Sequence, residues 1–123
     1  MTSRRLMFFV TVLAFLLAAF TPAVAAVPED TAAFVSYCTD HYEDCRSEVV
    51  DINNINMMRQ LGGNHGCSLP STGTGDRKAR HEYYIVATNA ILDWLKANSA
   101  TRAPKTFDAI SQAMKALWPS ECR

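Results

Sequence analysis

Apolar and polar positions alternate with helical spacing in the first half of the chain that follows residue 26. Residues on one face of an α-helix recur at i, i+3, i+4 and i+7. This spacing predicts a short helix that begins near Asp30 or Thr31 and a second helix from about His41 to Leu61. The apolar positions that carry the two predictions are Phe34, Tyr37 and Cys38 in the first helix and Cys45, Val49, Ile52 and Ile55 in the second.

The same spacing predicts two further helices in the second half of the chain. One is expected over roughly Arg77 to Asn98, and Pro104 suits the first turn of the next, which Pro119 would end. Their apolar stripes are Tyr84, Ala87, Ile91, Trp94 and Leu95, then Phe107, Ile110, Met114, Leu117 and Trp118. No stretch shows the sustained alternation of a strand. The predicted fold class is therefore all-α, a compact bundle of four main helices.

Local signals mark the ends of the second helix. Asp40 and Glu43 have the spacing of a capping box, in which the first side chain caps the helix and the second reaches back to a free amide. Gly62-Gly63 predicts the end of the helix, because glycine takes the left-handed conformation without strain. The stretch from Gly62 to Asp76 holds all five glycines of the chain and is expected to be its longest loop.

Residues 1–25 have the pattern of a secretory signal peptide. Arg4 and Arg5 precede a run of apolar residues from 6 to 20, and Ala23-Val24-Ala25 fits the A-x-A cleavage pattern. We expect cleavage after Ala25, export to the periplasm, and a single helical domain over residues 26–123. No further apolar run is long enough to span a membrane, so no membrane segment is expected after cleavage.

Four cysteines lie in residues 26–123, and export to an oxidising compartment predicts that they form two disulfides. In one unbroken helix Cys38 and Cys45 would lie about 10.5 Å apart, which is too far for a disulfide. A break between helices near Asp40 removes that obstacle. We therefore favour Cys38–Cys45 with Cys67–Cys122, and the alternative is Cys38–Cys67 with Cys45–Cys122.

No pattern in the chain indicates catalysis, a metal or a cofactor. The cysteine and histidine spacings match no common zinc site, and no G-x-S-x-G nucleophile elbow is present. Gly73 to Asp76 precedes a helix but lacks the lysine and hydroxyl of a phosphate-binding P-loop. Removing Arg4 and Arg5 from 12 basic and 12 acidic residues leaves a net charge of −2. This charge does not favour nucleic acid as a partner.

Binding residues are sought instead among polar and adaptable side chains. Asn53 and Asn56 stand in the middle of the second helix, although asparagine is a poor helix former, so they are candidate partner-binding residues. Met57 and Met58 follow, and methionine adapts well to binding surfaces, although a core position explains one of them equally well. Adjacent tyrosines 83 and 84 cannot both face one core, so one is expected to be partly exposed.

The order of these landmarks resembles the Rap/Tai family of type VI secretion immunity proteins. The shared features are a signal peptide, two cysteine-bearing helices, the motif Cys67-Ser68-Leu69-Pro70, and a last helix that runs through Trp118-Pro119 to Cys122. The resemblance implies a small periplasmic helical protein, often a homodimer, that neutralises a secreted cell-wall amidase toxin by binding it. It also implies a projecting binding element, for which Asn64, His65 and Ser68 in the long loop are the first candidates and Asn53 and Asn56 the second.

The predicted function is therefore inhibition of a secreted peptidoglycan-cleaving toxin, by binding and without catalysis. The alternative is a periplasmic stress chaperone, or another helical interaction module with no toxin partner. The two differ in a measurable way, because a chaperone of this kind would loosen and hold unfolded proteins at about pH 2–3, whereas an inhibitor would form one stable complex.

Overall fold

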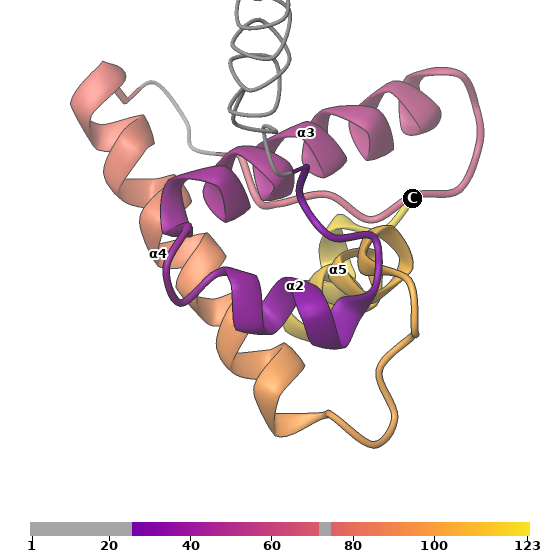
Figure 1. Ribbon diagram of the computed structural model, residues 1–123. Helices are drawn as coiled ribbons and strands as arrows, with labels where there is room; N and C mark the ends of the chain where they lie inside the picture. The colour runs from indigo at the N-terminus through magenta and orange to yellow at the C-terminus, as the bar shows by residue number, and fades with distance from the viewer. Residues whose placement is uncertain (1–25, 72–74) are drawn as a thin grey trace, which may run out of the picture.

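The computed structural model describes residues 26–71 and 75–123 and confirms the all-α fold class (Figure 1). The predicted signal peptide lies outside these residues, as does part of the long loop. Within the described ranges no helix has both the length and the apolar character to cross a membrane. The elements are α2 (Thr31–Tyr37), α3 (Tyr42–Leu61), α4 (Arg77–Ala97), α5 (Thr106–Leu117) and a 3-10 turn, η1 (Pro119–Glu121).

One hydrophobic core joins the four helices, and α5 contacts each of the other three. Two alanines of α5, Ala109 and Ala113, are fully buried and let neighbouring helices approach closely. The larger side chains around them come from every helix: Phe34, Val49, Ile52, Ile91, Leu95, Ile110 and Met114 are all fully buried or nearly so. Burying such a side chain stabilises the fold by about 1.5–3 kcal/mol.

A pair of threonines fixes the segment before α2 to the turn before α5. The backbone N–H of Thr31 donates to the carbonyl of Pro104 at 2.9 Å, and that of Thr106 donates to the carbonyl of Glu29 at 2.7 Å. The predicted place of Pro104 in the first turn of the last helix is wrong, because α5 begins at Thr106 with Lys105 as its N-cap. Pro104 instead supplies an acceptor that holds the start of α2.

The corner between α2 and α3 forms without the predicted capping box. The chain leaves α2 in a turn, so Asp40 stands one residue too early to cap α3, and its backbone N–H donates to the carbonyl of Tyr37 at 3.3 Å. His41 is the N-cap residue and makes no side-chain capping bond. Glu43 does not reach back to the helix start but forms an ion pair with Arg46 at 2.6 Å.

Two disulfides are present, with the pairing favoured from the sequence. Cys38 and Cys45 are joined across the corner, where their α-carbons are 5.7 Å apart because the chain turns between them. Cys67 and Cys122 are joined as well, so the chain after α3 is tied to the segment that follows α5.

Candidate functional site

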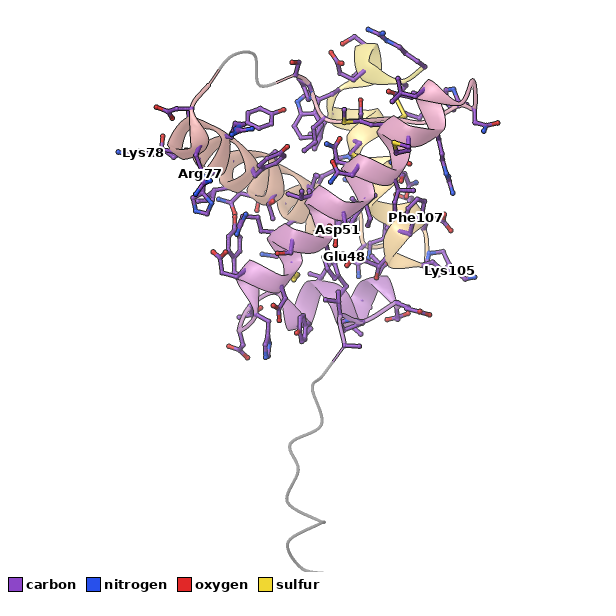
Figure 2. All side chains as sticks on the ribbon, turned by 90° about the horizontal axis from the view of Figure 1, so that it is seen from above. Glu48, Asp51, Arg77, Lys78, Lys105 and Phe107 are labelled. Carbon is purple, nitrogen blue, oxygen red and sulfur yellow. A yellow bond between two sulfur atoms is a disulfide. The ribbon has the colours of Figure 1, made fainter. Side chains whose placement is uncertain are left out.

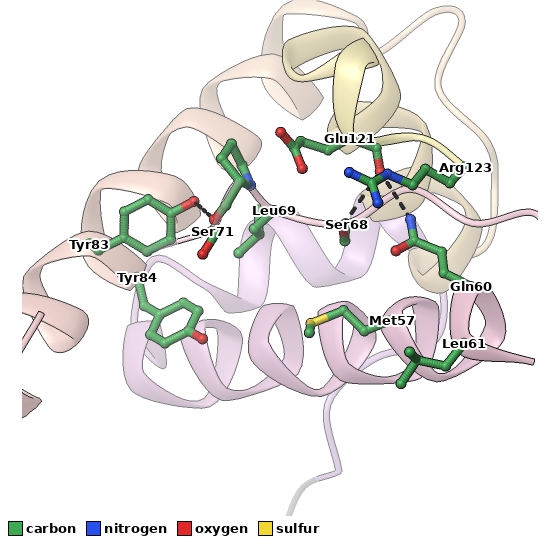
Figure 3. A pocket seen from close by; sticks show the side chains of 11 residues that line it. Met57, Gln60, Leu61, Ser68, Leu69, Ser71, Tyr83, Tyr84, Glu121 and Arg123 are labelled. Atoms are coloured by element: carbon green, nitrogen blue, oxygen red, sulfur yellow. Dashed lines mark hydrogen bonds between the residues drawn. The ribbon is translucent and has the colours of Figure 1, made fainter. Parts of the chain in front are cut away.

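A groove of about 440 Å³ lies where the end of α3, the start of α4, the segment 68–71 and the C-terminal segment meet (Figure 3). Apolar and aromatic side chains line much of it, and polar side chains stand at its edges. The lining residues are Met57, Gln60, Leu61, Ser68, Leu69, Pro70, Ser71, Tyr83, Tyr84, Glu121 and Arg123. It is the candidate binding site, and it is called the α3–α4 groove below.

The floor of the groove is an extended segment held against α3 and the C-terminal segment. Gly66 and Arg123 exchange backbone hydrogen bonds of 2.7 and 3.0 Å next to the Cys67–Cys122 disulfide. A Cβ atom at Gly66 would lie 3.0 Å from the carbonyl oxygen of Asn56, so a larger residue would push the segment away from α3. Glycine at this position therefore permits the close approach.

Side chains of α3 satisfy the polar groups of this floor. The Asn53 Oδ1 accepts a hydrogen bond from the backbone N–H of Leu69 at 2.8 Å. The Gln60 Nε2 donates to the carbonyls of Gly66 at 2.6 Å and Glu121 at 3.0 Å. The C-terminal segment pairs with the backbone of the floor around Cys67 as an antiparallel neighbour. The amide side chains of α3 bind groups that this short pairing leaves, such as the N–H of Leu69.

Three of the five candidate partner-binding residues are buried. Asn53 and Asn56 are only 4% and 2% exposed and bond within the chain, so they are not available at the surface of this structure. Asn56 donates to the hydroxyl of Ser111 at 3.1 Å. Ser68 is also buried, with its hydroxyl 3.5 Å from the carbonyl of Glu121.

The other two candidates, Asn64 and His65, are exposed beyond the end of α3. They follow Gly63, whose φ of +79° provides the left-handed turn predicted at this helix end. Neither residue lines the α3–α4 groove. The structure therefore does not bring the five candidates together on one surface.

The face that α3 buries agrees with the predicted one at Cys45, Val49 and Ile52 but not at Ile55. Ile55 was expected in the core but is 45% exposed, whereas Asn53 and Asn56 take the buried positions at i+4 and i+7 from Val49. Hydrophobicity alone predicts that Ile55 is buried. Asn53 suits this side of α3 because the floor segment presents the backbone N–H of Leu69 there, and Asn56 suits it because α5 presents the Ser111 hydroxyl. An isoleucine could bind neither group.

The α3 wall of the groove continues into exposed apolar side chains. Met57, Met58 and Leu61 are 45%, 68% and 81% exposed, and they lie close to one another on the last two turns of the helix. Met57 and Leu61, four residues apart, line the groove itself. Clustered exposed apolar groups at the rim of a groove are typical of a surface that contacts another molecule.

Two tyrosines form the α4 wall, and both are partly buried. The Tyr83 hydroxyl donates to the carbonyl of Pro70 at 2.7 Å, and burial, with smaller contributions from Tyr84 and Glu121, raises the pKa of Tyr83. The Tyr84 ring meets the Tyr83 ring edge-on at a centroid distance of 5.6 Å. Tyr83 thus fixes the floor segment to α4, while Tyr84 offers a ring face to the groove.

The acids and the histidine between Cys38 and Cys45 have a structural role in the corner. The Tyr37 hydroxyl donates to a carboxylate oxygen of Asp44 at 2.7 Å, and this bond raises the pKa of Tyr37. The His41 ring stacks on the Tyr37 ring at 4.1 Å. In residues 26–71 and 75–123 no three histidine, cysteine, aspartate or glutamate side chains are grouped so that they could hold a metal ion.

Comparison with known proteins finds no match to this chain. No family model, curated protein or solved structure matches the chain. The chemistry of the α3–α4 groove and the resemblance described above are therefore the grounds for a functional proposal.

Proposed function

We propose that this protein is a non-catalytic binding protein of the periplasm that inhibits a secreted peptidoglycan-cleaving amidase. The observation that carries the proposal is the α3–α4 groove, with exposed Met57 and Leu61 on one wall, exposed Met58 beside them, and two tyrosines on the other wall. The resemblance to the Rap/Tai immunity proteins supplies the class of partner.

The composition of the groove suits contact with a protein. Tyrosine and methionine are enriched in protein–protein interfaces, and charged residues are depleted from the centre of such interfaces. Here Met57, Leu69 and Tyr84 are among the apolar and aromatic lining residues, and the only charged lining residues are Glu121 and Arg123. Methionine has three rotatable bonds and a polarisable sulfur, so it can fit closely against a partner of irregular shape.

The framework around the groove is already ordered before any partner arrives. The Cys67–Cys122 disulfide and the backbone bonds between Gly66 and Arg123 hold the floor and the C-terminal wall together. Binding costs free energy when loops must become ordered, and a wall fixed in advance avoids that cost. An inhibitor that has to block a cleft for long periods benefits from such a framework.

Location in the periplasm is supported by the two disulfides and by the signal-peptide pattern of the sequence. Disulfides form and persist in oxidising compartments, and small exported domains use them in place of a larger core. A peptidoglycan-cleaving toxin also acts in this compartment, so inhibitor and target would meet there.

Co-expression with an amidase tests the proposal. The full chain is produced in a Gram-negative host together with a periplasm-directed amidase that is encoded beside its gene, and lysis is followed by optical density. We expect growth to be restored and a stable complex to elute from size-exclusion chromatography. Lysis at the same rate with and without the chain, together with full amidase activity in a mixture of the purified proteins, would overturn the proposal.

A further inference from the structure

The core-facing side of α4 extends beyond the core without a partner. Ala87 and Ile91 on this side are buried, and Tyr84, three residues earlier than Ala87, is half-buried at the groove. Arg80 lies four residues before Tyr84, and Arg77 lies three residues before Arg80. Both arginines are exposed. Residues at these spacings share one face of a helix. This face of α4 therefore carries apolar side chains within the core and basic side chains at the start of the helix, which projects past α3.

Figure 2 shows Arg77 and Lys78 at this free end of α4, which diverges from α3. Together with Arg80 they place three permanent cations in the first turn of the helix, where no acidic side chain is present. In the part of the chain that the structure describes, none of the three forms an ion pair. Cations at a helix start oppose the helix dipole, at a cost of about 0.3–1 kcal/mol each, so this cluster adds nothing to the stability of the fold.

The opposite edge of the groove is close to neutral. Glu121 and Arg123 carry one charge of each sign and both line the groove. The surface is therefore positive at the start of α4, and the side chains at the C-terminal edge of the groove have no net charge. The apolar walls lie between these two ends. From Arg77 to Tyr84 the helix rises by about 10.5 Å, which is the distance along the axis between the cations and the apolar centre.

We propose that the α3–α4 groove and the basic start of α4 form one docking surface for a protein segment that presents an apolar anchor beside acidic side chains. The apolar anchor packs between Leu61 and Tyr84, and the acidic side chains, about two helical turns away, face Arg77 and Arg80. This inference rests on the proposed function, because it assigns the segment to the inhibited amidase. Opposite charges at the edge speed association and fix the orientation of the partner, while the buried anchor slows dissociation.

A membrane surface fits the same residues less well. Anionic lipids attract cationic residues, and apolar side chains can insert into the bilayer, but insertion requires an apolar face that projects outward. Here the strongly exposed apolar side chains Met58 and Leu61 lie on α3 alone, whereas Leu69 and Tyr84 line a hollow that several elements form together (Figure 3). A side chain from a protein can enter this hollow, whereas a bilayer surface would touch only its edges.

Synthetic peptides test the chemistry of the segment directly. The first probe is a helical peptide with two leucines four residues apart and three glutamates about two turns away, and the second has lysine at each glutamate position. We expect the full chain to bind the acidic peptide about tenfold more tightly than the basic one, and the difference to shrink between about 50 and about 300 mM salt. Equal binding of the two peptides, or binding only to phosphatidylglycerol vesicles, would refute the inference.

Matched variants locate the surface, with the peptide and the co-expressed amidase as separate readouts. The double variant Arg77→Glu/Arg80→Glu is expected to slow association about tenfold, while Lys96→Glu at the other end of α4 leaves it unchanged. Leu61→Asp is expected to speed dissociation, while Val86→Asp, which changes an exposed apolar residue outside the groove, does not. All five positions are exposed, so the variants should fold.

The two readouts separate the possible failures. If the amidase is neutralised equally well by the charge-reversed and Leu61 variants, the docking surface is wrong and the proposed function stands. If the chain binds the acidic peptide through these residues but binds no amidase, the docking surface stands and the proposed function is wrong. If neither ligand binds, both are wrong.

Discussion

Replacing Asn53 by alanine should destabilise the protein, although alanine is the better helix former. The Asn53 Oδ1 accepts the only hydrogen bond that the structure assigns to the backbone N–H of Leu69 in the floor of the groove. Both residues are buried, so in the variant the N–H of Leu69 loses this acceptor in the interior of the protein. The next residue, Asn54, is exposed on the same helix, and Asn54→Ala is therefore a matched control.

The control removes the change in helix propensity from the comparison. What remains is chiefly the lost acceptor of the Leu69 N–H, together with the weak bond of 3.6 Å that the Asn53 Nδ2 donates to the Met57 sulfur. Each change from asparagine to alanine gains up to about 0.7 kcal/mol of helix propensity, and this gain cancels when the two variants are compared. A buried donor left without an acceptor costs about 1–3 kcal/mol. We therefore expect Asn53→Ala to be less stable than Asn54→Ala by about 1–3 kcal/mol, and Asn54→Ala to be as stable as the unmodified protein or slightly more so.

Urea denaturation followed by far-ultraviolet circular dichroism measures this difference. With a slope of about 2 kcal/mol per M urea, a difference of 2 kcal/mol moves the midpoint by about 1 M. Hydrogen exchange gives a second readout, because the Leu69 amide should lose protection in Asn53→Ala and keep it in Asn54→Ala. Midpoints that agree within about 0.2 M, or an unchanged Leu69 amide, would refute the assigned role of Asn53.

The remaining predictions concern cross-links and pH. Replacing Cys67 and Cys122 by serine should cost about 4 kcal/mol, because the bond closes a loop with a sequence separation of 55, whereas the Cys38–Cys45 pair, with a separation of 7, should cost about 2.4 kcal/mol. Thermal unfolding of the two double variants checks the order, and an equal loss would contradict it. Burial raises the pKa of Glu48, with a smaller contribution from its acidic neighbour in the next turn. The folded state therefore binds the proton more tightly than the unfolded state, and Glu48 reduces stability as pH rises through the window between the two pKa values. Glu48→Gln should stabilise the protein at pH 7 and have no such effect below that window, and urea midpoints at the two pH values would show whether the gain disappears in acid.

Three features of the structure depend on local information in the chain, and these could be predicted. The helical stripes need only side chains three and four residues apart, so α4 was placed over nearly its observed length. The Cys38–Cys45 pairing requires that one helix ends and another begins within seven residues. The sequence predicts such a break between helices, although the capping box from which it is predicted does not form. Gly63 ended α3 because a left-handed residue there is a property of the backbone itself.

The site depended on contacts between distant segments. Spacing shows that Val49, Asn53 and Asn56 share one face of α3, but it cannot show that an extended segment covers that face in preference to the face of Ile55. The partners of the two asparagines, the N–H of Leu69 and the hydroxyl of Ser111, come from residues more than a dozen positions later in the chain, so only the tertiary structure brings them to this side of α3. The groove likewise exists only where α3, α4 and the C-terminal segment meet, because a hollow is a property of packed elements and not of any one of them.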